Sequence, residues 1–123
     1  MKREILYRGK TLIDNKWIYG YLSTVDKSGV PVILEPEKEN HWMKVHPETV
    51  GQYTGLKDRN GVKIFEGDIV KEGLYKYTIE YYKYGFWANG GQRGATWELR
   101  KFENQCEIIG NIHDNPDLLK ETA

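Results

Sequence analysis

The chain has 123 residues, of which 39% are hydrophobic and 13% aromatic, so it can bury one core and lacks the composition of a disordered chain. Its 18 basic and 18 acidic residues cancel, which excludes an overall electrostatic attraction to nucleic acid or to an anionic membrane. A single cysteine excludes an internal disulfide.

The first part of the chain predicts short strands. Aromatic and β-branched residues at 17–22 and apolar residues at 30–34 flank a turn cluster at 26–29, a pattern typical of a β-hairpin. A charged loop containing proline and a brief strand at 42–45 follow. We therefore expect residues 1–46 to form an N-terminal hairpin region.

Turn and strand signals continue through the middle of the chain. Asn60 and Gly61 both tolerate positive φ and predict a tight turn. Gly67 before Asp68 indicates another position of positive φ, with the carboxylate free to accept hydrogen bonds from amides of the turn. Residues 75–81 alternate aromatic or β-branched with polar side chains, which predicts a half-buried strand.

The end of the chain offers the best helix start. Asn115 can cap a helix, Pro116 suits the first helical position, and Asp117 favours the positive end of the helix dipole. We expect one short C-terminal helix over residues 115–121.

The spacing of strands and turns decides the fold class. Many short strands separated by glycine turns, without alternating helices, predict an all-β fold built as a small antiparallel barrel or a pair of barrel-like sheets. We expect one domain over residues 1–123, with its barrel-like part at 47–114.

Several stretches carry a family resemblance. They are the segment 47–70, with the sequence PETVGQYTGLKDRNGVKIFEGDIV, the opening at 3–10, the aromatic run at 17–22 and the closing segment at 108–119. Together they resemble the landmarks of the YopX family of phage and prophage proteins. The resemblance covers nearly the whole chain, and only about 73–102 departs from it.

The resemblance implies a protein encoded by a phage or prophage, located in the cytoplasm of the host bacterium. It also implies an all-β architecture related to SH3-like barrels, together with self-association. It implies no catalytic residue. The lack of an apolar signal-peptide core and of a long apolar run leads to the same cytoplasmic expectation, with no membrane partner.

Motifs for enzymatic chemistry are incomplete. Asp58 and Asn60 resemble the start of a calcium loop but lack its bidentate glutamate, and Cys106 in an apolar strand is typical of a core residue. Glu66 and Asp68 could share one face of a strand, as paired carboxylates of a nuclease do, but no lysine and third acid follow in a recognisable pattern. We predict no enzymatic activity, no cofactor, and no catalytic or metal-binding residue.

Residues 75–100 hold the most distinctive pattern, because aromatic side chains alternate there with a local excess of cations. Such residues can fill the core of a small barrel, anchor a protein interface, or stack on the bases of a single-stranded nucleic acid. We rank these roles in that order. The candidate contact residues for an interface or a nucleic acid are Tyr82, Lys83, Tyr84, Phe86, Trp87 and Arg93.

The supply of aromatic residues motivates the functional prediction. The chain contains 9 Tyr, 4 Trp and 3 Phe residues, more than a small domain buries easily, so some should form an interface. We predict a non-enzymatic interaction module that forms a homo-oligomer, with a phage or host protein as a further partner. The alternatives are a single-stranded nucleic-acid binder using residues 75–100 and, after it, a metal-dependent nuclease.

Overall fold

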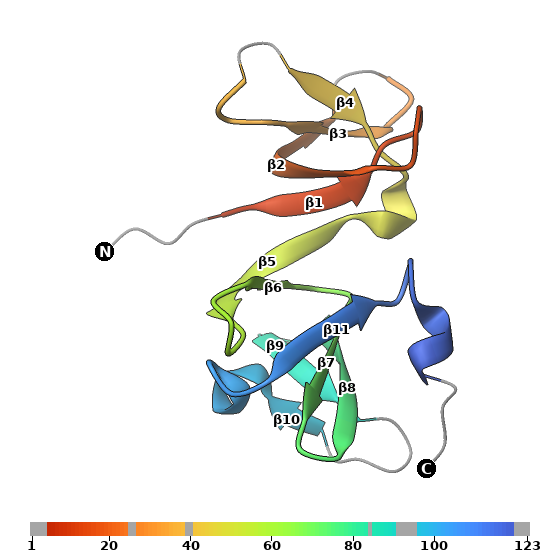
Figure 1. Ribbon diagram of the computed structural model, residues 1–123. Coiled ribbons are helices and arrows are strands. Elements are labelled where there is room, and N and C mark those ends of the chain that lie inside the picture. The colour runs from red at the N-terminus through yellow and green to blue at the C-terminus, as the bar shows by residue number, and fades with distance from the viewer. Residues whose placement is uncertain (1–4, 25–26, 39–40, 84, 91–95, 120–123) are drawn as a thin grey trace. The chain divides into compact units, whose positions relative to one another are not determined.

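The structure is a computed structural model in which the chain divides into two compact units, Met1–Tyr53 and Thr54–Ala123 (Figure 1). The residues that it describes are 5–24, 27–38, 41–83, 85–90 and 96–119. Every regular element in these ranges is a β-strand or a short 3-10 helix. The predicted all-β fold is therefore confirmed.

The first unit holds the strands β4-β3-β2-β1-β5 of a six-stranded sheet whose order continues to β6. Its elements are β1 (Tyr7–Lys10), β2 (Trp17–Thr24), β3 (Pro31–Leu34), β4 (Trp42–Lys44), the 3-10 helix η1 (Pro47–Thr49) and the first half of β5 (Gly51–Lys57). Strands β2 and β3 pair from Tyr21 opposite Leu34 to Thr24 opposite Pro31. The strands predicted on either side of the turn cluster at 26–29 are therefore paired.

One face of this sheet forms a small core. Ile18, Ile33 and Val45 are buried together, and Tyr7 packs against them. Gly9 lies so close that a Cβ atom on it would be 3.0 Å from the Cβ of Val45. Because side chains alternate between the faces of a strand, the neighbours of these residues point to the opposite face of the sheet.

The second unit contains an antiparallel sheet with the order β10-β9-β8-β7-β11, and β6 lies beside β5. Its elements after β5 are β6 (Lys63–Phe65), β7 (Asp68–Glu72), β8 (Tyr75–Tyr82), β9 (Gly85–Asn89), β10 (Thr96–Glu98), η2 (Leu99–Phe102), β11 (Glu107–Asn111) and η3 (Pro116–Leu119). The strand orders begin and end in different strands, and within the described ranges only an isolated bridge between Thr11 and Val45 links the end of β1 to the end of β4, so neither sheet is a closed barrel. The closed barrel, one of the two predicted forms of the all-β fold, is not formed.

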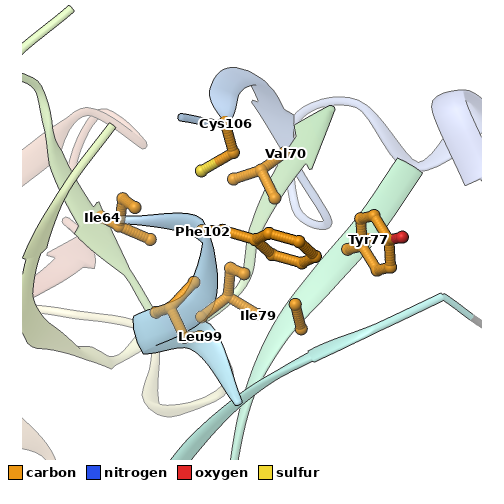
Figure 2. Packing of buried hydrophobic residues seen from close by; sticks show 8 residues of the cluster. Ile64, Val70, Tyr77, Ile79, Leu99, Phe102 and Cys106 are labelled. Atoms are coloured by element: carbon orange, nitrogen blue, oxygen red, sulfur yellow. The ribbon is translucent and has the colours of Figure 1, made fainter. Parts of the chain in front are cut away.

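The core of the second unit lies between one face of its sheet and η2 (Figure 2). Tyr77 and Ile79 of β8 point into it, and the ring centroids of Tyr77 and Phe102 are 4.9 Å apart. The cluster consists of Ile64, Val70, Tyr77, Ile79, Ala88, Leu99, Phe102 and Cys106. The predicted alternation along 75–81 is confirmed at the centre of the strand.

Both predicted turns form. Gly61 has a φ of 80°, and its amide donates to the carbonyl of Asp58 at 3.0 Å. Gly67 has a φ of 93°, and the amide of Phe65 donates to the Asp68 carboxylate at 2.7 Å. A left-handed φ suits glycine because it has no Cβ atom.

The predicted C-terminal helix is present as the 3-10 helix η3. The amide of Leu118 donates to the carbonyl of Asn115 at 3.1 Å. The side-chain oxygen of Asn115 accepts a hydrogen bond from the amide of Asn111 at 3.2 Å. Residues 120 and 121, the predicted end of the helix, lie outside the described ranges.

Candidate binding surfaces

The buried carboxylate of Asp58 serves the backbone. Its Oδ1 accepts hydrogen bonds from the amides of Asn60 and Val62, both at 2.9 Å, and its Oδ2 accepts one from the amide of Ile108 at 3.1 Å. Only 2% of Asp58 is exposed. The residue therefore holds the Asn60 turn against β11 and does not face a substrate.

Asp68 is buried as well, and its bond to the amide of Phe65 closes the turn between β6 and β7. Glu66, the other acid of the suggested pair, lies within that turn. Within the described part of the chain, no group of three or more His, Cys, Asp or Glu is placed to hold a metal ion.

Cys106 is fully buried in the core of the second unit (Figure 2). Burial raises the pKa of its thiol to about 11, and the nearby carboxylate of Asp58 adds to this effect. A thiol with such a pKa is neutral at physiological pH, whereas the thiolate is the nucleophile. Cys106 is a core residue, as its apolar surroundings in the sequence indicate.

Thiol reactivity tests this assignment. At about pH 8 we expect the folded protein to react with an aromatic disulfide reagent far more slowly than the protein in denaturant, because access requires opening of the core. Since the pKa is higher in the folded state, the stability contributed by the neutral thiol should be lost as the pH rises from 9.0 towards 11. Rapid labelling of the folded protein would contradict a buried, neutral thiol.

The register of β8 and β9 distributes the candidate contact residues over two faces. Tyr81 pairs with Phe86, and Tyr82 pairs with Gly85. Because paired residues share a face and neighbours alternate, Phe86 lies on the core face, and Tyr82 and Trp87 lie on the opposite, outer face. Tyr84 and Arg93 lie outside the described residues.

Trp87 occupies the centre of that outer face. Glu80 of β8 and Glu98 of β10 are its two cross-strand partners. The indole Nε1 of Trp87 donates to the carbonyl of Tyr82 at 2.9 Å, and the ammonium of Lys83 lies 5.4 Å from the ring centroid of Tyr82. We call Glu80, Tyr82, Lys83, Trp87 and Glu98 the acidic aromatic face of the second sheet.

The first sheet carries a second exposed aromatic surface, which the sequence pattern did not predict. Ile18 points into the core, so Trp17, Tyr19 and Tyr21 point to the other face of β2. Tyr19 is 43% exposed and Tyr21 56%. The guanidinium of Arg8 lies 4.5 Å from the ring centroid of Trp17.

This surface continues across β3 and β4. Tyr21 pairs with Leu34, which pairs with Trp42, and Lys44 is on the same face of β4 as Trp42. On the other side, Lys10 of β1 pairs with Trp17. We call Lys10, Trp17, Tyr19, Tyr21, Leu34, Trp42 and Lys44 the basic aromatic face of the first sheet.

A signal for this face is present in the sequence. The run WIYGYL at 17–22 places its aromatic residues at alternate positions, with Ile18 and Gly20 between them. Because apolar residues occupy both faces of this run, polar residues do not mark the exposed side. The pattern therefore indicates a strand but not which of its faces is exposed.

Comparisons with known proteins found a matching family model and a solved structure of similar fold. The family model for YopX protein matches residues 6–120. The crystal structure of protein EF1440 from Enterococcus faecalis matches with a TM-score of 0.59 and 21% identity, over 96% of this chain and 99% of that one. This likeness shows a shared fold.

A comparison with curated proteins gave no match. None of the helices in the described ranges has the length and apolar character needed to cross a membrane. Because the family model spans nearly the whole sequence, the chain belongs to the YopX family.

Proposed function

We propose that this YopX protein is a non-enzymatic interaction module, encoded by a phage or prophage and acting in the host cytoplasm. It forms a homo-oligomer and presents its remaining surface to a phage or host protein. The hydrogen bonds of its buried carboxylates and the burial of its thiol support a role without enzymatic activity. Asp58 and Asp68 are committed to backbone amides, and the Cys106 thiol is buried with a raised pKa.

The acidic aromatic face of the second sheet is the observation that carries self-association. Tyr82 is 61% exposed beside Trp87, and aromatic residues of this kind anchor protein interfaces. Glu80 and Glu98 on this face and Lys83 at its margin provide charges of both signs. A symmetric pair of copies can therefore place the lysine of one copy near the glutamates of the other.

The same charges disfavour the nucleic-acid alternative for residues 75–100. Trp87 stands between Glu80 and Glu98. A phosphate backbone that followed bases stacked on this ring would pass two carboxylates and be repelled by both.

Light scattering across a hundredfold dilution tests self-association. We expect an oligomer at high concentration. Trp87→Ala should raise its dissociation constant about 30-fold or more, as the loss of an aromatic hot spot does. Trp42→Ala is the matched control, because Trp42 is 45% exposed and lies on the first sheet. A monomer at every concentration, or an equal effect of the two variants, would refute the proposed interface.

A further inference from the structure

We propose that the basic aromatic face of the first sheet binds single-stranded nucleic acid. This site is separate from the acidic aromatic face of the second sheet and does not depend on self-association there. It also differs in place and charge from the aromatic segment at 75–100.

The aromatic side chains of this face are arranged as a stacking platform. Trp17, Tyr19 and Tyr21 follow one another at every second position of β2, so their Cα atoms are spaced by about 7 Å. Trp42 extends the platform across β3 and β4 through Leu34. Stacking of bases on exposed aromatic rings tolerates any sequence, because every base has a π face.

Buried contacts hold the platform in place. Arg8 is only 6% exposed, and its guanidinium lies against the ring of Trp17. A Cβ atom on Gly20 would be 1.9 Å from the carbonyl oxygen of Leu34, so this glycine allows β2 and β3 to pair closely beneath the exposed rings. Rings fixed in this way lose little entropy on binding.

The charged residues of the basic aromatic face indicate which class of ligand it binds. Lys10 of β1 and Lys44 of β4 both lie beside the bridge between Thr11 and Val45, where the amide of His46 donates to the carbonyl of Lys10 at 2.8 Å and the amide of Leu12 donates to the carbonyl of Lys44 at 2.9 Å. The ammonium of Lys10 is 5.6 Å from the ring centroid of Trp17. The four strands β1 to β4, all within the described ranges, contain no Asp or Glu. Cations beside a row of exposed rings suit a phosphate backbone whose bases stack on the rings.

The exposed rings also distinguish single strands from duplexes. In a duplex the base faces are stacked on one another and are inaccessible to aromatic side chains, whereas single-stranded bases can unstack onto a protein surface. The platform is therefore expected to bind single strands more tightly than a duplex of the same composition.

Fluorescence anisotropy with labelled oligo-dT, oligo-U and a duplex tests the proposal at low salt. We expect saturable binding of a single strand, with the two oligonucleotides showing whether DNA, RNA or both are bound. Tyr21→Ala should weaken binding about tenfold. Tyr81→Ala is the matched control, because Tyr21 is 56% exposed and Tyr81 is 55% exposed on the second sheet.

The salt dependence provides a second readout. Affinity should fall as salt rises, and Lys44→Ala should reduce the slope of log affinity against log salt by about 0.7 for one lost phosphate contact. Lys71→Ala, an exposed lysine of β7, should leave the slope unchanged.

Three results would overturn the proposal. The first is an absence of anisotropy change at low salt with both single strands. The second is equal weakening by Tyr21→Ala and Tyr81→Ala, which would place the contact elsewhere. The third is an oligomer, seen by light scattering, that Tyr21→Ala dissociates while no oligonucleotide binds, because the face would then be covered by a second copy.

Discussion

Gly20→Ala is expected to destabilise the first unit by about 3 kcal/mol or more, beyond the usual cost of overpacking. The new methyl group would lie 1.9 Å from the carbonyl oxygen and 2.7 Å from the carbonyl carbon of Leu34. Both atoms belong to the backbone of β3, so the clash cannot be relieved by a side-chain rotation. Strands β2 and β3 would have to separate, with loss of their ladder of hydrogen bonds.

Urea denaturation followed by circular dichroism measures this loss. Gly85→Ala is the matched control, because Gly85 also lies in a strand and a Cβ atom on it would meet nothing within 4 Å. We expect this control to change the free energy of unfolding by less than about 1 kcal/mol. Similar values for the two variants would show that β2 and β3 are not packed as closely as the structure places them.

Asp58→Ala is expected to destabilise the second unit by about 4 kcal/mol, because three backbone amides lose a charged acceptor at once. The amides belong to Asn60, Val62 and Ile108. A buried amide that has no acceptor has lost its hydrogen bonds to water without replacing them. The decrease in the free energy of unfolding should therefore exceed that of an ordinary surface substitution. Denaturant unfolding gives the free energy directly.

Asp58→Asn removes the charge and keeps part of the hydrogen bonding. Its amide oxygen can still accept from Asn60 and Val62, but its Nδ2 cannot accept from Ile108. We expect the free energy of unfolding of this variant to lie between those of the wild-type protein and Asp58→Ala. If Asp58→Ala unfolded within about 0.5 kcal/mol of the wild-type protein, the role of this carboxylate in holding the turn would be refuted.

Local features of the fold could be predicted from the sequence because they depend on neighbouring residues. The turn at Gly61 and the turn at Gly67 each require a residue that tolerates positive φ, and both glycines adopt it. The alternation around Tyr77 and Ile79 fixed which side chains of β8 enter the core. Each of these features rests on residues within one element or one turn.

Features that depend on distant residues could not be predicted. The bond between the Asp58 carboxylate and the amide of Ile108 joins positions 50 residues apart. The sequence therefore indicated a turn at this place without its attachment to β11. The openness of the sheets is also set by which strands pair, and short strands of similar composition do not specify that order.

The candidate contact residues show how strand register limits such predictions. Phe86 and Trp87 are neighbours in the sequence, but they point to opposite faces of β9. Grouping aromatic residues by sequence position therefore combined a residue of the core face with residues of the outer face. The surface of the first sheet was missed for the related reason that apolar residues occupy both faces of β2.

The four tryptophan indoles report on both proposed surfaces in one measurement, a nitrogen–proton correlation spectrum of the indole N–H groups. We expect dilution to shift the signal of Trp87, and a single-stranded oligonucleotide to shift the signals of Trp17 and Trp42. The account predicts these two responses in different tryptophans, because two separate faces bind two different partners. Shifts of Trp87 and Trp97 on addition of the oligonucleotide, with Trp17 and Trp42 unchanged, would contradict it.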